Sequence, residues 1–326
     1  MLPRDRSSEA APRGRSGRAL TPASDIYVVP PTGEIPLSRG APERKLQRTD
    51  RYDRRAELTA YDALTPTGTV RLSFQVVDDQ PFDFHPGYFI GIKANVEDVG
   101  PCKSPYCIVS PPNPDRTFQL LVRLVPEGPL SYYLAGLDVG DVIGFRGPSG
   151  RSMAPKEEGT ELVLLATGVG VGPLLAFVQD LTTHGFARPI RLFWGLRLVE
   201  DICLLDELDD LTSRCDSFSY QVSLSQPPDD WTGLWGRVTE TVPPLLETLG
   251  NKHYYLVGNG EMTEEMSTVL SDLGVDVRLI YEEVYFNVKY KPDRQIMDTV
   301  RSRFVACDLF SPYAHRQAGL FMPQSP

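Results

Sequence analysis

Residues 161–185, "ELVLLATGVGVGPLLAFVQDLTTHG", narrow the possible folds more than any other stretch of this chain. A continuous apolar run leads into a turn rich in glycine, and a proline and a helix-like pattern follow. The 17 uncharged residues 162–178 nearly reach the length of a membrane span, but the turn divides them into two short pieces. The stretch therefore predicts a buried strand, a tight turn and a helix of a soluble fold, with no membrane span.

The same alternation of strand-like and helix-like runs continues over the whole of residues 161–286. We predict strands at 161–167, 189–196, 218–225, 253–260 and 277–286, and helices at 173–185, 200–214, 239–250 and 261–274. Strands that alternate with helices form a parallel sheet with helices on both faces. This half of the chain is therefore predicted to be a doubly wound α/β domain.

Residues 56–150 show a different pattern, of short alternating runs separated by turn residues. Strand-like runs lie at 69–77, 87–94, 118–125 and 141–147, and one helix is predicted at 131–137. Alternation with period two is typical of antiparallel strands, which here form a small barrel or sandwich. The expected division is a disordered basic tail (1–54), a β domain (55–152), an α/β domain (153–286) and a C-terminal extension (287–326).

The formal net charge of −10 is spread unevenly over the 326 residues. Residues 1–55 carry 12 Lys/Arg against 7 Asp/Glu and residues 287–326 carry 6 against 3, so residues 56–286 carry −18. An acidic body with basic tails argues against nucleic acid as the main partner. Five cysteines do not indicate a secreted disulfide scaffold, and the N-terminus shows no secretory signal. We therefore expect a cytoplasmic protein.

Two segments have the chemistry of a phosphate site. The turn at 164–173, "LLATGVGVGP", has the spacing G-x-G-x-G-P rather than the dinucleotide fingerprint G-x-G-x-x-G. Its glycines still let the backbone approach a pyrophosphate, and the next helix presents free N–H groups; the alternative is a tight turn without a ligand. In "PEGPLSYYL", Ser131 is either a helix N-cap or part of a second phosphate site.

Cys102 and Cys107, in "CKSPYCIVSPP", have the spacing C-x4-C. A plant-type [2Fe–2S] site needs a further cysteine three residues on, where Ser110 stands, and the other cysteines lie about a hundred residues away. No His/Cys group has the spacing of a zinc site. The sequence therefore predicts no metal site.

The order of several motifs along the chain is more specific than any one of them. "HPGYF" (85–89), "SPYCIVS" (104–110) and "LLVRLVPEGPLS" (120–131) are followed by "TGVGVGP" (167–173), "FWGLR" (193–197), "LSQPPDDWTGLWGRVT" (224–239) and "LVGNGEM" (256–262). This ordered set resembles the ferredoxin–NAD(P)H reductase superfamily over about residues 56–286. The resemblance implies an α+β, two-domain fold: an antiparallel β-barrel that binds a flavin, followed by a doubly wound α/β domain that binds a nucleotide.

The resemblance also implies the flavin site. The family's barrel motif R-x-Y-S/T is Ser104-Pro105-Tyr106-Cys107 here, so Tyr106 would pack on the flavin and Cys107 would face flavin N5. Ser104 replaces the family arginine that meets the phosphate; Lys103 or Arg123 would then supply the charge. The remaining residues that it implies for the flavin are Val122, Gly128, Pro129, Leu130, Ser131, Tyr285 and Phe286. Cys107 and Tyr285 are the predicted catalytic residues, and the alternatives are a packing role for Cys107 and a core role for Tyr285.

The nucleotide site follows from the second half of the resemblance. Its predicted residues are Thr167, Gly168, Val169, Gly170, Gly172, Pro173, Gly195, Ser225, Gly258 and Asn259. Val257 stands where the family has a cysteine beside the nicotinamide. No basic residue follows Ser225 before Arg237, which favours NADH, although Arg197 or Arg191 would reach a 2′-phosphate if they lie nearby.

The expected activity is hydride transfer from NADH or NADPH to FAD, with FMN as the alternative flavin. Electrons would then pass to a protein acceptor such as a ferredoxin. Two alternatives remain at this point: a flavin subunit of a larger redox complex, and a redox-sensing module with weakened catalysis.

Overall fold

The computed structural model describes residues 54–96, 99–125, 128–155, 161–246 and 248–285. These residues lie within one compact unit. The predicted tail up to residue 53, the predicted extension 287–326 and Phe286 lie outside the described residues.

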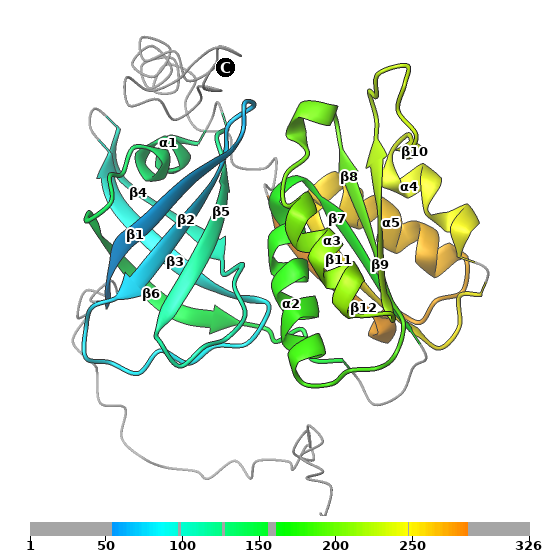
Figure 1. Ribbon diagram of the computed structural model, residues 1–326, viewed down its shortest axis with the longest axis horizontal. Coiled ribbons are helices and arrows are strands. Elements are labelled where there is room, and N and C mark those ends of the chain that lie inside the picture. Colours follow the sequence, from blue (N-terminus) through cyan, green and yellow to red (C-terminus); the bar gives the residue numbers. More distant parts are fainter. Residues whose placement is uncertain (1–53, 97–98, 126–127, 156–160, 247, 286–326) are drawn as a thin grey trace, which may run out of the picture. The chain divides into compact units, whose positions relative to one another are not determined.

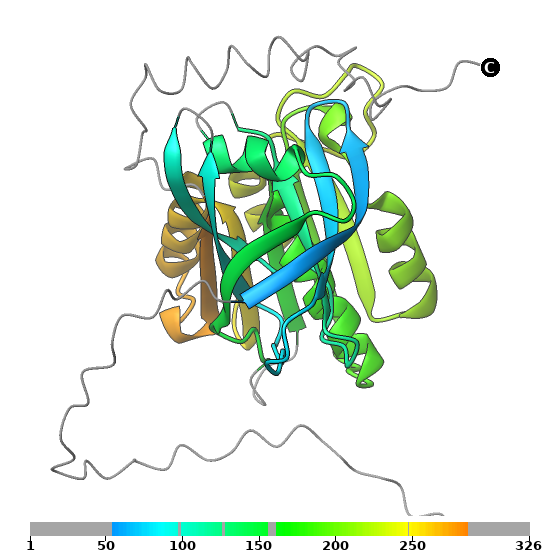
Figure 2. The same cartoon turned by 90° about the vertical axis from the view of Figure 1, so that its left-hand side faces the viewer.

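The first half of the described chain is an antiparallel sheet of six strands in the order β4-β3-β6-β1-β2-β5. The strands are β1 (Arg54–Thr65), β2 (Thr69–Val76), β3 (Tyr88–Val96), β4 (Gly100–Cys107), β5 (Thr117–Arg123) and β6 (Val142–Gly150). Alternate residues such as Val70, Leu72 and Phe74 are fully buried in its interior. The two edges of the sheet meet just beyond the end of β4, where the Val109 N–H donates to the carbonyl oxygen of Gln119 in β5 at 2.9 Å. The sheet therefore curls into the predicted barrel, which Figure 2 shows in front.

The second half is a parallel sheet of six strands in the order β10-β9-β8-β7-β11-β12. Its strands are β7 (Glu161–Thr167), β8 (Ile190–Leu196), β9 (Phe218–Leu224), β10 (Leu234–Trp235), β11 (Lys252–Asn259) and β12 (Ile280–Tyr285), and its helices are α2 (Val171–Thr183), α3 (Leu205–Arg214), α4 (Val238–Thr241) and α5 (Gly260–Asp272). Leu162 and Leu164 pack on the side of α2 and α3, whereas Val163 and Leu165 pack on the side of α4 and α5 (Figure 1). Both faces are therefore covered, as the alternating sequence predicts.

Some predicted elements differ from those observed. The helix expected at 239–250 is only α4, followed by a 3-10 turn at Pro243–Leu245, because two successive prolines supply no N–H for helical hydrogen bonds. The helix in the first half, α1 (Pro129–Ala135), begins two residues before the predicted start. β1 and β4 were not predicted as separate strands.

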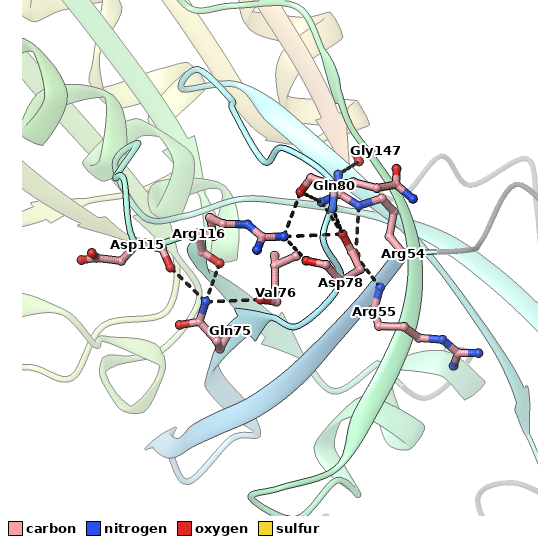
Figure 3. A network of polar contacts seen from close by, with 9 residues as sticks. All are labelled: Arg54, Arg55, Gln75, Val76, Asp78, Gln80, Asp115, Arg116 and Gly147. Carbon is pink, nitrogen blue, oxygen red and sulfur yellow. Dashed lines mark hydrogen bonds and ion pairs between the residues drawn. The ribbon is translucent and has the colours of Figure 1, made fainter.

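A buried arginine fixes the start of β1 to the rest of the barrel (Figure 3). Arg54 is 6% exposed and its guanidinium lies 5.4 Å from the Phe82 ring centroid and 5.3 Å from that of Phe145. It donates to both carboxylate oxygens of Asp78 at 3.1 Å and to the Gly147 carbonyl at 3.1 Å. Burial alone would raise the pKa of Asp78, but hydrogen bonds from Arg54 and two backbone amides hold that pKa below its usual value.

Candidate active site

A cavity of about 380 Å³ lies between the barrel and the carboxyl ends of the parallel strands. The barrel contributes Thr69, Leu121 and Arg123 to its lining, and Tyr285 at the end of β12 closes part of it. In open α/β sheets, ligands bind beyond the carboxyl ends of the strands. The cavity therefore has the position expected of a nucleotide site.

Six of the ten residues predicted for the nucleotide line this cavity: Thr167, Gly168, Val169, Gly195, Ser225 and Asn259. The other four, Gly170, Gly172, Pro173 and Gly258, do not line it. Sequence reasoning did not assign to the site several further lining residues: Leu121, Trp194, Asp201, Cys203, Glu261 and Glu265.

Glycine is required for a different structural reason at each of the three glycine positions of the turn. Gly168 has a φ of +54°, and a Cβ built there would meet nothing within 4 Å, so it leaves the cavity open. A Cβ on Gly170 would clash with the carbonyl oxygen of Val257, and one on Gly172 would lie 2.6 Å from Val109 Cγ1. Gly170 therefore allows close packing of the turn on β11, Gly172 allows close packing of α2 on the barrel, and of these three glycines only Gly168 faces ligand space.

The turn is held in place by two hydrogen bonds. Trp194, which is 1% exposed, donates from its indole Nε1 to the Gly168 carbonyl at 2.9 Å. The backbone N–H of Asn259 donates to Thr167 Oγ1 at 3.0 Å. These bonds fix the backbone before any ligand arrives, which lowers the entropy cost of binding.

On the flavin side, the two faces of β4 differ. Ser104 and Tyr106 pair with Ile92 and Ile90 of β3, and Tyr106 packs against the barrel core. Burial raises the pKa of Tyr106, so its ring is a neutral surface at ordinary pH. Lys103 is exposed and, one residue from Ser104, lies on the opposite face of the strand. The Lys103 side chain is therefore on the face opposite to Ser104, where the family arginine would stand.

Cys107 lies beside an acidic side chain that the sequence did not point out. Its Sγ donates to Glu283 Oε1 at 3.9 Å, and the Tyr281 hydroxyl lies 3.3 Å from Glu283 Oε2. Burial raises the pKa of the Cys107 thiol to about 12, so it is a thiol rather than a thiolate at neutral pH. Burial also raises the pKa of Glu283, although hydrogen bonds from Tyr281 and Cys107 oppose the shift. Cys107 of the barrel and Glu283 of β12 thus join the two domains beside Tyr285.

Tyr285 provides the test of whether a cofactor fits here. Its buried hydroxyl has no oxygen or nitrogen partner among the described residues and only the Cys107 thiol as a weak partner, and the residue lines the cavity. An unsatisfied buried hydroxyl is costly, so a group in the cavity that accepts its proton would stabilise the site. Burial raises the pKa of Tyr285 well above its usual value, which keeps the hydroxyl a donor. The residues present therefore fit a flavin with polar ring atoms.

Three residues assigned to the flavin have other side-chain contacts. Arg123 lines the cavity and forms an ion pair with Asp201 at 3.0 Å, so it lies with the nucleotide residues. Val122 is 1% exposed in the barrel core. Ser131 is not an N-cap: Gly128 has that position, and the Ser131 hydroxyl donates to the Gly128 carbonyl at 2.6 Å. Leu130 is also buried, whereas Gly128, Pro129 and Pro105 are more accessible.

Comparison with known proteins assigns the barrel to FAD and the α/β domain to NAD. A family model described as an oxidoreductase FAD-binding domain matches residues 58–153, and one described as an oxidoreductase NAD-binding domain matches residues 164–268. The chain belongs to the ferredoxin–NAD(P)H reductase superfamily. It is an NAD(P)H-dependent flavoprotein reductase whose cofactors are FAD and NAD(P)H.

Individual relatives cover different shares of this reductase. A protein named ferredoxin–NADP reductase B from Sorangium cellulosum is 29% identical over 71% of this chain and 96% of its own length. The reductase component of propane 2-monooxygenase from Gordonia sp. strain TY-5 is 31% identical, but the match spans only 57% of this chain and 54% of the relative. The solved ferredoxin reductase in carbazole 1,9a-dioxygenase is 25% identical, with a TM-score of 0.63 over 72% of this chain and 69% of that one.

Two further observations concern the described part of the reductase. No described helix is long and apolar enough to cross a membrane. Among the described residues, no three His, Cys, Asp or Glu side chains are grouped so as to hold a metal ion, and Cys102 and Cys107 are free cysteines.

Proposed function

We propose that this reductase passes electrons from NAD(P)H to a small iron–sulfur protein of the ferredoxin type. The support is the Sorangium protein, which is named a ferredoxin–NADP reductase and which this chain matches over 96% of its length. The Sorangium protein is therefore little longer than the matched region, which includes both domains. By analogy, the proposed role of this chain is that of a free-standing reductase. Relatives named as oxygenase reductase components are consistent with it.

FAD, when bound, accepts hydride from nicotinamide and releases electrons singly. Tyr106 and Tyr285 would hold it, because Tyr106 packs partly buried against the barrel core next to Cys107 and Tyr285 lines the cavity. Glu283 accepts hydrogen bonds from Cys107 Sγ and from the Tyr281 hydroxyl, which orients its carboxyl group beside Tyr285.

The cavity also bears on the choice between NADPH and NADH. Arg197, after β8, and Arg237, before α4, are exposed and line the same cavity as Ser225. Arg191 forms an ion pair with Glu161 and donates to the Leu245 carbonyl, and it does not line the cavity. We propose that Arg197 and Arg237 receive a 2′-phosphate, which would make NADPH the preferred donor rather than the NADH that the sequence favours.

The test of the acceptor is steady-state turnover with NADPH, using the full chain loaded with FAD. Reduction of a plant-type [2Fe–2S] ferredoxin at a rate near that of a dye acceptor would support the proposal. Dye turnover without reduction of [2Fe–2S] or [4Fe–4S] ferredoxins would overturn it. Bound flavin that neither NADH nor NADPH reduces anaerobically would instead favour a sensing module.

Replacing both Arg197 and Arg237 by Gln tests the donor separately. We expect KM for NADPH to rise by about tenfold or more and KM for NADH to change little, because only NADPH has the 2′-phosphate. Equal changes for both dinucleotides would exclude these two arginines as the 2′-phosphate site.

A further inference from the structure

One polar cluster crosses the boundary between the two domains at the edge of the cavity. Arg123 of β5 lies 3.0 Å from the Asp201 carboxylate, which belongs to the 3-10 turn after β8. Thr67, in the turn between β1 and β2, donates from its hydroxyl to Asp201 Oδ1 at 2.7 Å. Arg123 and Asp201 both line the cavity. A positive and a negative charge from different domains are thus placed at the edge of a site for an anionic ligand.

The hydrogen bonds of the cluster fix where the arginine lies. Arg123 donates to Thr67 Oγ1 at 2.6 Å and to Thr69 Oγ1 at 3.2 Å. The Thr67 proton is committed to Asp201, so Thr65 Oγ1, 3.0 Å from Thr67 Oγ1, is the donor of that contact. Asp201 Oδ2 accepts from the Leu198 N–H at 3.3 Å, which orients the carboxylate. Several hydrogen bonds, from residues of both domains, therefore fix the positions of Arg123 and Asp201.

Asp201 and Arg123 differ in how accessible their side chains are from the cavity. The Asp201 side chain is 13% exposed, whereas that of Arg123 is 31% exposed and faces the cavity. A guanidinium offers five N–H donors, so Arg123 has donors left for a phosphate oxygen. An entering phosphate would compete with Asp201 for the same positive charge.

We propose that Asp201 is a positioning residue of the nucleotide site: it holds Arg123 at the cavity and offsets its charge until a phosphate of the dinucleotide binds there. The proposal rests on the use of NAD(P)H and is independent of the acceptor proposed above. It implies that the charge of Asp201 weakens dinucleotide binding while its hydrogen bonds orient Arg123. Asp201 and Arg123 therefore have opposite effects on affinity, although they form one ion pair.

A second ion pair across the same boundary supplies the matched control. Arg71 of β2 donates to Glu207 of α3 at 2.7 Å, and neither residue lines the cavity. If boundary ion pairs merely held the domains together, both pairs would affect binding in the same way. If Asp201 acts as proposed, only the pair at the cavity affects it.

The experiment measures the Kd of NAD⁺ and NADP⁺ by calorimetry on the oxidised, FAD-loaded full chain, so no acceptor is involved. We expect Arg123→Gln to raise Kd by about tenfold and Asp201→Asn to lower it by about threefold, because Asn keeps an acceptor oxygen but no charge. In the Arg123→Gln background, Asp201→Asn should have no effect on Kd. Arg71→Gln and Glu207→Gln should leave Kd unchanged. Similar changes with NAD⁺ and NADP⁺ indicate the shared pyrophosphate, and changes with NADP⁺ alone indicate its 2′-phosphate.

Three results would overturn the proposal. The first is an Asp201→Asn variant whose Kd rises as much as that of Arg123→Gln. The second is an effect of Asp201→Asn on Kd that persists in the Arg123→Gln background. The third is an equal loss of affinity in the Arg71 and Glu207 variants. If the Asp201→Asn chain does not fold, Asp201→Ser, which also removes the charge, replaces it. Added salt should reduce the difference in Kd between wild type and either variant.

Discussion

The barrel contains two arginines with similar ion pairs and different surroundings. Arg54 meets Asp78 at 3.1 Å and Arg123 meets Asp201 at 3.0 Å. The Arg54 side chain is 7% exposed and lies near the rings of Phe82 and Phe145. Its hydrogen bonds to described residues all stay within the barrel (Figure 3). The Arg123 side chain is 31% exposed, faces the cavity and is bonded to a residue of the other domain.

The distance between the charges therefore does not distinguish a structural ion pair from a functional one. What distinguishes them is whether a ligand can reach the cation and replace its partner. Arg54 is enclosed, so its contribution belongs to folding. Arg123 is accessible from the cavity, so its contribution belongs to binding.

The largest expected effect is on the enclosed pair. Replacing Arg54 by Met leaves the largely buried Asp78 with Arg116, 3.5 Å from its carboxylate, as its remaining cation, and we expect a loss of about 3 kcal/mol in the free energy of unfolding. Urea unfolding of the FAD-loaded chain measures this loss. Arg55→Met is the control, because Arg55 is the exposed neighbour on the same strand. A loss below about 1 kcal/mol, or a changed Kd for NADP⁺ in folded protein, would remove the distinction between the two arginines.

Two glycines of one turn extend the comparison to the backbone. Gly170→Ala places a Cβ against the Val257 carbonyl, and we expect it to cost about 2–3 kcal/mol of stability. Gly168→Ala meets no atom but has a φ of +54°, so it should cost about 1 kcal/mol and should raise KM for the dinucleotide. Thermal unfolding and steady-state kinetics of the two variants separate these effects. Equal stability losses with unchanged KM would mean that Gly168 is also only a packing position.

The sequence predicts the fold well because both domains follow simple periodicities. The run 161–167 is the predicted buried strand, and Thr167, Gly168 and Val169 of the following turn line the cavity. The prolines at 243 and 244 shortened a helix that the apolar pattern had extended. Local pattern thus defines the elements, and local breakers decide their ends.

The site was less predictable because its polar contacts join residues far apart in the sequence. Arg123 and Asp201 are 78 residues apart and Cys107 and Glu283 are 176 apart, so no motif spacing connects them. The motif match assigned Arg123 to the flavin, and its side chain lines a cavity that residues assigned to the nucleotide also line. Trp194 could have been found as a buried indole at the end of a strand, since such an N–H needs an acceptor.

A smaller effect is expected from pH on the enclosed pair. The pKa of Asp78 is lower in the folded chain than in the unfolded one, so the folded state binds this proton less readily. The stabilisation is fully present above the unfolded pKa of about 4 and is lost as the pH falls through the folded pKa. Urea unfolding from pH 7 to pH 3 should therefore show less loss of stability for Asp78→Asn than for wild type. Parallel pH profiles would contradict this assignment.

The smallest effect is expected at Cys107, the barrel residue that meets Glu283 across the domain boundary. Its pKa of about 12 keeps the thiol protonated at neutral pH, so it acts as a weak donor and not as a charged group. Cys107→Ser keeps a donor at this position, and we expect the anaerobic rate of flavin reduction by NADPH to change by less than about twofold. Cys107→Ala removes the donor and leaves Glu283 with one fewer partner, so it should slow the rate more than Ser does. If Cys107→Ser slows flavin reduction as much as Cys107→Ala does, the reaction requires the sulfur atom itself. The contact between Cys107 and Glu283 would then have a chemical role, unlike the ion pairs of Arg54 and Arg123, which act through charge.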